Sequence, residues 1–172
     1  MKKIIFSILA LSLIAGSVFC QEKIDIVKEK SAIIAVIENA TAAWVARDLD
    51  RLAVTSVTDE TFIRLVAGKS GFEYAIGWND RAASAKKIFA DNPNPNAVKF
   101  ENKNYKIKVY PKSAWAVYEE NWSDSEGEFL GMSINVRFLE KANEEWKIVY
   151  LSVINTTSYE DEEDEDDDDS DD

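Results

Sequence analysis

The side chains that could do chemistry in this chain are carboxylates and aromatic rings, because the sequence contains no histidine. Any proton transfer would therefore use a carboxylate, a tyrosine or a lysine. Glu119 and Glu120 are adjacent in a segment that alternates like a strand, so they point to opposite faces, and Glu120 shares its face with Tyr118 and Trp122. In an apolar pocket the pKa of Glu120 would be raised and it could act as a base. The alternative is a solvated strand end, since glutamate is almost never fully buried unless it is paired.

Aromatic residues are numerous in this chain, and five of them are tryptophans. Those in the predicted helices and strands are Trp44, Phe62, Trp78, Tyr105, Trp115, Tyr118, Trp122, Trp146 and Tyr150. One interpretation is an aromatic-lined pocket for a small apolar molecule, because ligand sites are usually apolar with a few polar groups. The other is ordinary packing in a core and a dimer contact.

Helices are expected in the first half of the chain. Apolar residues recur at spacings of three, four or seven over 26–47 and predict a helix there. Asp50 is expected to cap a short second helix, and Asn79 or Asp80 a third over 81–90.

Strands dominate the second half, after a loop rich in proline and asparagine. The segments expected to form strands are 61–67, 72–78, 99–110, 113–122, 128–140 and 146–155. The last four are long and joined by short turns, which is typical of an antiparallel meander. Helices followed by strands predict an α+β fold.

Two motifs at the ends of this arrangement resemble the NTF2-like superfamily, which includes SnoaL-like and ketosteroid isomerase-like domains. The first is Ala43-Trp44-Val45-Ala46-Arg47-Asp48-Leu49-Asp50-Arg51-Leu52, and the second is Glu145-Trp146-Lys147-Ile148-Val149-Tyr150-Leu151-Ser152. The resemblance covers 26–159 and implies a cone: a strongly curved antiparallel sheet with the N-terminal helices packed on its concave face. Many SnoaL-like members carry histidines at two alternate positions of the last strand, where this chain has Tyr150 and Ser152.

The resemblance also implies which residues would line the interior of the cone. The expected inward row of the last strand is Ile148, Tyr150, Ser152 and Ile154, and the expected outer row is Val149, Leu151 and Val153. Tyr150 and Ser152 would then orient a ligand near Tyr118 and Trp122, with Trp44 and Phe62 closing the helical side. These six residues are the predicted ligand-binding site.

The strand over 128–140 has two distinct side-chain rows. The apolar row is Met132, Ile134, Val136 and Phe138, and the polar row is Ser133, Asn135 and Arg137. We expect the apolar row to face inward and the polar row to lie on the outer face. In the superfamily that face often packs against a second subunit, so a homodimer is expected there; a solvated face is the alternative.

The first twenty residues resemble a secretory signal peptide, with Lys2 and Lys3 before an apolar stretch too short for a comfortable membrane span. A retained N-terminal anchor is the alternative. Phe19 is too bulky for a lipoprotein signal that would attach lipid to Cys20, so cleavage after Cys20 is favoured. We therefore expect a protein exported to the periplasm or secreted, without a membrane span after cleavage, whose domain covers 21–159.

The segment 160–172 is acidic at every position except Ser170 and accounts for most of the net charge of −12. Such a block repels itself, so a disordered tail is expected, either a solvating spacer or a loose Ca²⁺ ligand. The acidity argues against nucleic acid as a partner.

The sequence supports two classes of function. The first, which we favour, is a non-catalytic module that binds a small apolar ligand or a protein partner in or around the cone. The second is a cofactor-free isomerase, cyclase or hydratase that works with a carboxylate and a tyrosine. No phosphate loop, zinc motif or nucleophile triad is recognisable, so no cofactor or metal is expected.

Overall fold

The computed structural model describes residues 24–69, 71–93 and 99–156. The predicted signal peptide at 1–20 and the acidic segment at 160–172 lie outside these residues. The helices of the described part are α2 (Ile26–Val45), α3 (Leu49–Thr55) and α4 (Trp78–Asp91). Its strands are β1 (Ile63–Gly68), β2 (Gly71–Ile76), β3 (Lys99–Val109), β4 (Ser113–Ser123), β5 (Phe129–Ala142) and β6 (Glu145–Thr156).

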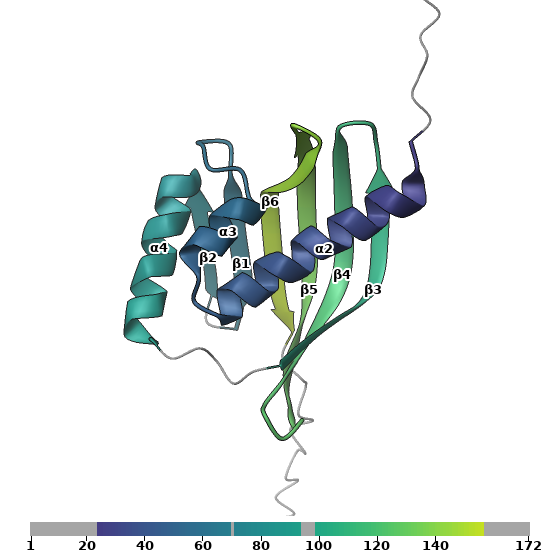
Figure 1. The fold of residues 1–172 in the computed structure, drawn as a ribbon. Helices are drawn as coiled ribbons and strands as arrows, with labels where there is room; N and C mark the ends of the chain where they lie inside the picture. Colours follow the sequence, from purple (N-terminus) through teal and green to yellow (C-terminus); the bar gives the residue numbers. More distant parts are fainter. Residues whose placement is uncertain (1–23, 70, 94–98, 157–172) are drawn as a thin grey trace, which may run out of the picture.

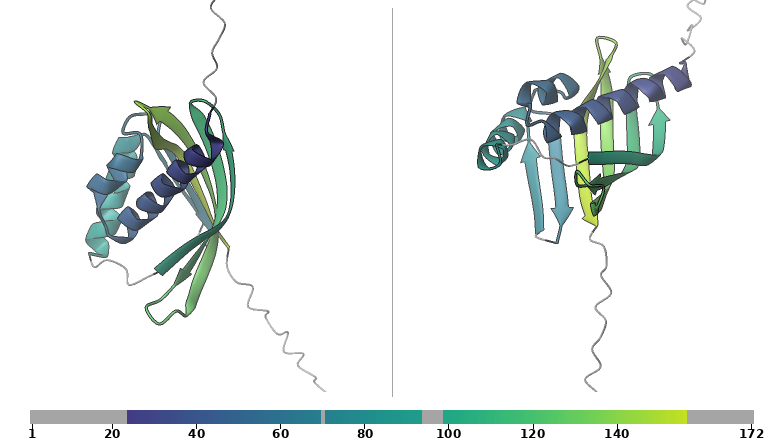
Figure 2. Two further views of the ribbon diagram at one scale, coloured as in Figure 1. Left: turned by 45° about the vertical axis from the view of Figure 1, so that its right-hand side comes forward. Right: turned by 60° about the horizontal axis from the view of Figure 1, so that its bottom comes forward.

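The strands form one sheet in the order β2-β1-β6-β5-β4-β3. All neighbours are antiparallel except β1 and β6, which are parallel. The helices lie on one face of this sheet, and α2 crosses it diagonally (Figure 1). The sheet curves around α2, so the helices occupy its concave side (Figure 2). The predicted α+β cone is confirmed.

The helix boundaries follow from local capping. Asp25 caps α2 by accepting a hydrogen bond from the backbone N of Lys28 at 3.1 Å. The chain leaves α2 through Arg47, which has a left-handed φ of 59°. Asp48, not the predicted Asp50, caps α3, accepting from the backbone N of Arg51 at 2.9 Å. Neither predicted cap serves α4, because that helix begins earlier, after Gly77, with no side-chain cap.

The core lies between α2 and the concave face. Ile33 and Ile37 lie one turn apart on the buried side of α2 and are fully buried. They pack in one cluster with Leu139 and Ile148 from the sheet and with Phe62, which precedes β1. This cluster fixes how deeply α2 sits in the cone.

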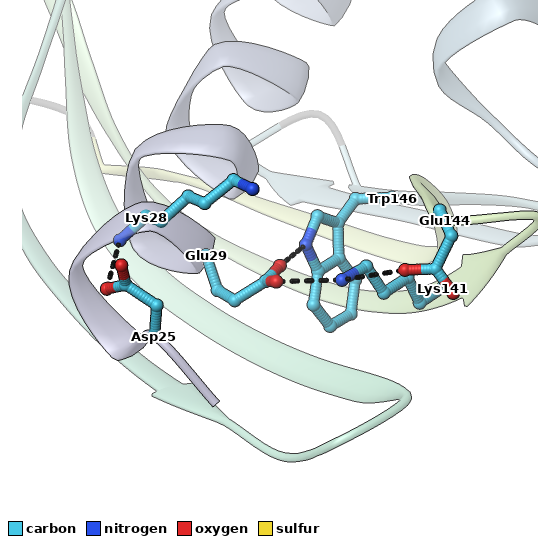
Figure 3. Close-up of polar contacts among 6 residues, drawn as sticks. All are labelled: Asp25, Lys28, Glu29, Lys141, Glu144 and Trp146. Atoms are coloured by element: carbon cyan, nitrogen blue, oxygen red, sulfur yellow. Dashed lines mark hydrogen bonds and ion pairs between the residues drawn. The ribbon is translucent and has the colours of Figure 1, made fainter. Parts of the chain in front are cut away.

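The first turn of α2 is held to the β5–β6 hairpin by Glu29 (Figure 3). Its carboxylate accepts hydrogen bonds from Lys141 Nζ and Trp146 Nε1, both at 2.7 Å. Lys141 Nζ also lies 3.5 Å from the Glu144 carboxylate. The bond from Lys141, together with that from Trp146, holds the pKa of Glu29 below its usual value. One end of the long helix is therefore fixed to the sheet by polar contacts.

The two side-chain rows of β5 lie opposite to the prediction. The polar residues Ser133, Asn135 and Arg137 are buried on the concave side, while the apolar residue Phe138 is exposed on the convex side. Alternation indicates that the two faces of a strand differ, but it does not say which face the rest of the chain covers. The interior of this cone is polar along β5.

The register of β6 changes at a β-bulge. Phe138 pairs with Tyr150 but the next residue, Leu139, pairs with Ile148, so Val149 is an extra residue in β6. The bulge shifts the alternation by one position. The predicted inward placement of Tyr150 and Ser152 is therefore wrong, and Leu151 faces inward instead.

The convex face of the sheet carries a row of exposed apolar residues over β2, β1, β6 and β5, whereas β3 contributes lysines such as Lys106 and Lys108 to the same face. Cross-strand pairing aligns Ile76 with Ile63, Ile63 with Tyr150, and Tyr150 with Phe138. The exposed apolar residues of this face are Ile63, Phe72, Tyr74, Ile76, Trp115, Phe138 and Ile154, which we call the convex apolar face. No described helix covers it (Figure 2).

Candidate functional site

A cavity of about 230 Å³ opens on the concave side, between the helices and the sheet. Its walls come from α2, α3 and α4 on the helical side and from β1, β4, β5 and β6 on the sheet side. The segments that meet here are far apart in the sequence. The cavity is smaller than the usual range of roughly 300–1,000 Å³ for ligand pockets, which suits a small molecule.

Aromatic rings form one part of the wall. Trp44, Phe62, Trp78 and Trp122 all line the cavity. Phe62 and Trp78 meet edge to face with their ring centroids 5.7 Å apart, an arrangement that aromatic pairs prefer. The ring centroid of Trp44 lies 5.0 Å from that of Phe89 in α4. These contacts between elements position Trp44, Phe62 and Trp78 in the cavity wall.

Three arginines line the same cavity: Arg64 of β1, Arg81 of α4 and Arg137 of β5. The exposed fraction of each residue is below one tenth, with Arg81 the lowest at 5%. Arginine is rarely buried to this extent unless it is paired with an anion. The partners of these guanidinium groups therefore decide what the cavity can bind.

Arg81 has the fewest partners. Its guanidinium carbon lies 4.4 Å from the centroid of the Trp44 ring, a cation–π contact. Its buried Nη1 makes no hydrogen bond to any described residue. Burial, reinforced by the positive charges of Arg64 and Arg137, lowers the pKa of Arg81 from its usual value to about 9.

Arg64 and Arg137 are better satisfied. Arg64 Nη1 lies 3.4 Å from the Glu73 carboxylate, whose side chain is 68% exposed, so this ion pair lies at the rim and is weak. Arg137 Nη1 donates to the backbone carbonyl oxygens of Ser152 and Val136 at 3.1 and 3.2 Å. Arg137 also lies over the Tyr118 ring, 5.5 Å from its centroid.

Glu120 is the acidic residue of the cavity wall. It is only 4% exposed, so the solvated alternative is wrong for this residue. The Thr41 hydroxyl donates a hydrogen bond to Glu120 Oε2 at 3.0 Å. Burial raises the pKa of Glu120 above its ordinary value, although the charge of Arg137 opposes the shift. A buried carboxyl group with a raised pKa is a candidate for proton transfer.

Further polar groups extend across the concave face beside the cavity. Cross-strand pairing aligns Glu120 with Ser133 and Tyr118 with Asn135. The Asn135 amide donates to Ser133 Oγ at 2.8 Å, but its oxygen has no partner among the described residues. Burial raises the pKa of Tyr118 to about 12, which makes this tyrosine a poor base. Buried polar atoms without partners are rare in native proteins and indicate bound water or ligand.

The structure places the predicted site residues in three groups. Trp44, Phe62 and Trp122 line the cavity. Tyr118 is buried on the concave side, where its ring packs under Arg137, and it does not line the cavity. Tyr150 and Ser152 lie on the convex face because of the bulge at Val149, so they do not line it either.

Sequence reasoning missed Arg64, Arg81 and Arg137 as site residues. A signal was present for two of them, because Arg64 and Arg137 each interrupt an apolar strand, in Ile63-Arg64-Leu65 and Val136-Arg137-Phe138. A charge within such a strand must be on the outside, be paired, or line a cavity. Arg81 gave no such signal, because charged residues are common in amphipathic helices.

No group of residues in the described ranges is suited to hold a metal ion. No helix among the described residues is both long and apolar enough to cross a membrane.

The SnoaL-like domain model matches residues 33–155, which include every element of the cavity wall. The chain belongs to the SnoaL-like domain family. None of the curated proteins matches it.

Solved structures support the same fold. A protein of unknown function with a cystatin-like fold from Nostoc punctiforme is 15% identical, with a TM-score of 0.61 over 75% of this chain and 92% of that one. An NTF2-like protein of unknown function from Pseudomonas putida is 14% identical, with a TM-score of 0.61 over 78% of this chain and 91% of that one. A further NTF2-like protein of unknown function, from Shewanella oneidensis, is 19% identical, with a TM-score of 0.58 over 73% and 98%. At these identities the likeness concerns the fold alone.

Proposed function

We propose that this SnoaL-like domain is an exported binding protein that holds a small molecule in the concave cavity. The observation that carries the proposal is the wall of that cavity. Aromatic rings make up much of its apolar lining, and Arg81 Nη1 in the same lining is buried without a hydrogen-bond partner among the described residues. A ligand with an apolar body and a polar end would contact the rings and supply that partner, as ligands do in most small-molecule sites.

Binding without catalysis fits these side chains better than an acid–base reaction does. Proton transfer commonly needs two groups with different pKa values, one acid and one base. The cavity wall has one carboxyl group, Glu120, and the neighbouring Tyr118 does not line the cavity and holds its proton too tightly to serve as the acid. Arginine side chains stay protonated and serve to bind and orient.

The burial of Glu120 favours a second candidate, a cofactor-free isomerase, cyclase or hydratase. In that case Glu120 would take a proton from a substrate whose developing negative charge is stabilised by the arginines. The variant Glu120→Gln separates the two functions. An enzyme would keep substrate binding and lose turnover by at least about a hundredfold, since general acid–base catalysis contributes that much. A binding protein would show no turnover in either form.

A variant that fills the cavity tests the binding function. Ala40 lines the cavity from α2, whereas Ala35 lies on the same helix and is exposed. We expect Ala40→Phe to abolish binding of small ring compounds such as benzamide and benzoate, and Ala35→Phe to leave it unchanged. The intrinsic fluorescence of the cavity tryptophans reports binding, and far-UV circular dichroism confirms that both variants fold. Equal binding by Ala40→Phe and the native protein would show that the ligand sits elsewhere.

We further propose that the protein forms a homodimer through the convex apolar face. That face carries seven exposed apolar residues. Large exposed apolar patches on soluble proteins commonly mark interaction sites. The β2–β1 part of the face is the most apolar, with Phe72, Tyr74 and Ile76 each more than half exposed. Two identical faces of this kind can pair around a twofold axis.

A further inference from the structure

We propose that the concave cavity selects organic anions, and that its ligand is a small carboxylate bound by Arg81 with support from Arg64 and Arg137. This inference rests on the binding function proposed above and names the chemical class of its ligand. It follows from the charges of the cavity wall, from the missing partners of Arg81, and from the shape of the space beside it.

The charges of the cavity wall do not balance. Three guanidinium groups line the cavity, and Glu120 is the one carboxyl group in that lining. Glu73 lies close to Arg64, but its side chain is mostly in solvent. Even with both carboxylates ionised, one positive charge has no counterpart among the described residues that line or border the cavity. One negative charge on a ligand would balance it.

The positive charge without a counterpart lies on Arg81. Its Nη1 is buried without a hydrogen-bond partner among the described residues, and its guanidinium carbon lies 4.4 Å from the centroid of the Trp44 ring. The positive charges of Arg64 and Arg137 raise the free-energy cost of keeping Arg81 charged in the cavity wall. A chain that only needed packing at this position would be more stable with an apolar residue. The arrangement is explained if an anion completes it.

A carboxylate matches the donors that remain. Guanidinium groups present planar pairs of N–H donors that bind carboxylates with two parallel hydrogen bonds. A single excess charge suits a monoanion better than a phosphate monoester, which carries nearly two negative charges at neutral pH. The aromatic rings beside Arg81 and the volume of about 230 Å³ suit a flat apolar body of about one ring.

Benzoate and benzamide test the inference, because they have nearly the same shape and differ in charge. We expect the native protein to bind benzoate at least about tenfold more tightly than benzamide at pH 7.5, since charge-assisted hydrogen bonds are the stronger kind. Phenylphosphonate carries a phosphonate group in place of the carboxylate, and it should bind more weakly than benzoate. Isothermal titration calorimetry at low and at physiological salt gives the three dissociation constants.

Substitution of Arg81 shows whether that residue provides the preference. Arg81→Met should remove the preference for benzoate and change benzamide binding less than about threefold. Arg81→Lys keeps the charge but loses the planar pair of donors, so an intermediate preference is expected. Arg51→Met is the matched control, because Arg51 is exposed on α3 and does not line the cavity. If Arg81→Met does not fold, Arg81→Lys and the native preference still decide the question.

The outcomes separate this inference from the binding function. Benzamide binding that Ala40→Phe abolishes, with no preference for benzoate, overturns the anion class and leaves the binding function standing. A benzoate preference that survives in Arg81→Met overturns the role of Arg81. Tighter binding of phenylphosphonate than of benzoate overturns the carboxylate class. Failure of all three probes to bind overturns both proposals.

Discussion

Replacing Arg81 with methionine should make the protein more stable when no ligand is bound. Most substitutions of buried residues destabilise a protein, so an increase would be informative. The expectation arises because Arg81 is 5% exposed, lies beside two other arginines and has an unpartnered Nη1. Methionine is unbranched and flexible, so it can follow the path of the arginine stem and fill the same space.

The size of the effect follows from the pKa of Arg81. The decrease in the pKa of Arg81 from its usual value to about 9 corresponds to about 5 kcal/mol, since each tenfold change in an equilibrium constant is worth about 1.4 kcal/mol. This is the free-energy cost of keeping the guanidinium charged in the folded protein. The substitution also removes the cation–π contact with Trp44, which stabilises the native protein by about 1–2 kcal/mol. Residual solvation reduces the difference further, so we expect a net gain of about 1–3 kcal/mol.

The cost of Arg81 depends on pH in a definite direction. Its folded-state pKa is lowered, so below about pH 9 the residue is charged in both states and the cost is complete. As pH rises from about 9 towards the usual pKa of arginine, the folded protein releases the proton first and the cost disappears. The difference between Arg81→Met and the native protein should therefore be constant from pH 6 to 8 and decrease above pH 9.

Urea unfolding followed by tryptophan fluorescence measures the difference. The midpoint should increase for Arg81→Met with the same slope, and Arg51→Met should stay within about 0.5 kcal/mol of the native protein. Benzoate should stabilise the native protein more than Arg81→Met, because the variant binds it more weakly, and the difference in stability between the two proteins should become smaller. A loss of more than about 1 kcal/mol in Arg81→Met would refute the reasoning, because it would mean that the fold itself satisfies this arginine.

Further outcomes are expected elsewhere in the chain. The pKa of Glu120 is raised, so its ionisation destabilises the fold as pH rises from 4.5 through its folded-state pKa. In thermal unfolding, Glu120→Gln should therefore be more stable than the native protein at pH 7 and equally stable at pH 4. A lower stability of Glu120→Gln at pH 7 would contradict this. Glu29→Ala should lower the free energy of unfolding in urea by about 1–2 kcal/mol, because Lys141 and Trp146 lose their shared acceptor. The control Glu145→Ala, at an exposed ion pair, should change it by less than about 0.5 kcal/mol. Equal losses would argue against an anchoring role for Glu29. Phe138→Glu on the convex apolar face should convert a dimer into a monomer in sedimentation equilibrium. The control Val27→Glu, on the exposed side of α2, should remain a dimer. A monomeric native protein would exclude the proposed dimer. Mass spectrometry of protein from the native host should find an N-terminus at Gln21, and a lipid-modified Cys20 would contradict the proposed cleavage.

Local patterns in the sequence were enough for the elements and the α+β class, and the resemblance of two motifs to the NTF2-like superfamily implied the cone. The apolar spacing over 26–47 predicted α2 within two residues, and alternation predicted the four long strands that make up most of the sheet. These elements form where the sequence predicts them because periodicity and turn residues act over a few neighbouring positions. Trp44, Phe62 and Trp122 were also predicted to line the cavity, since large aromatic residues on inward positions must be covered by another element.

The tertiary structure alone decided which way the strands of the cone face. Tyr150 and Ser152 were placed inside on the assumption of unbroken alternation, but the extra residue Val149 reverses the faces of β6. The rows of β5 were reversed for a different reason. Alternation cannot say which face the helices cover, and here they cover the polar row that contains Arg137.

The charged part of the cavity also depended on the tertiary structure. Arg64, Arg81 and Arg137 come from a strand, a helix and a second strand, and nothing in their local sequence relates one to another. The parallel pairing of β1 with β6 and the packing of α4 bring them to one cavity. The free-energy cost of burying Arg81 comes from its position beside the other two arginines in the fold, not from its residue type alone. The sequence by itself thus determined which elements form, because those depend on neighbours along the chain, and its two family motifs indicated the fold that these elements build. The electrostatics of the cavity depend on distances between segments that only the folded chain brings together.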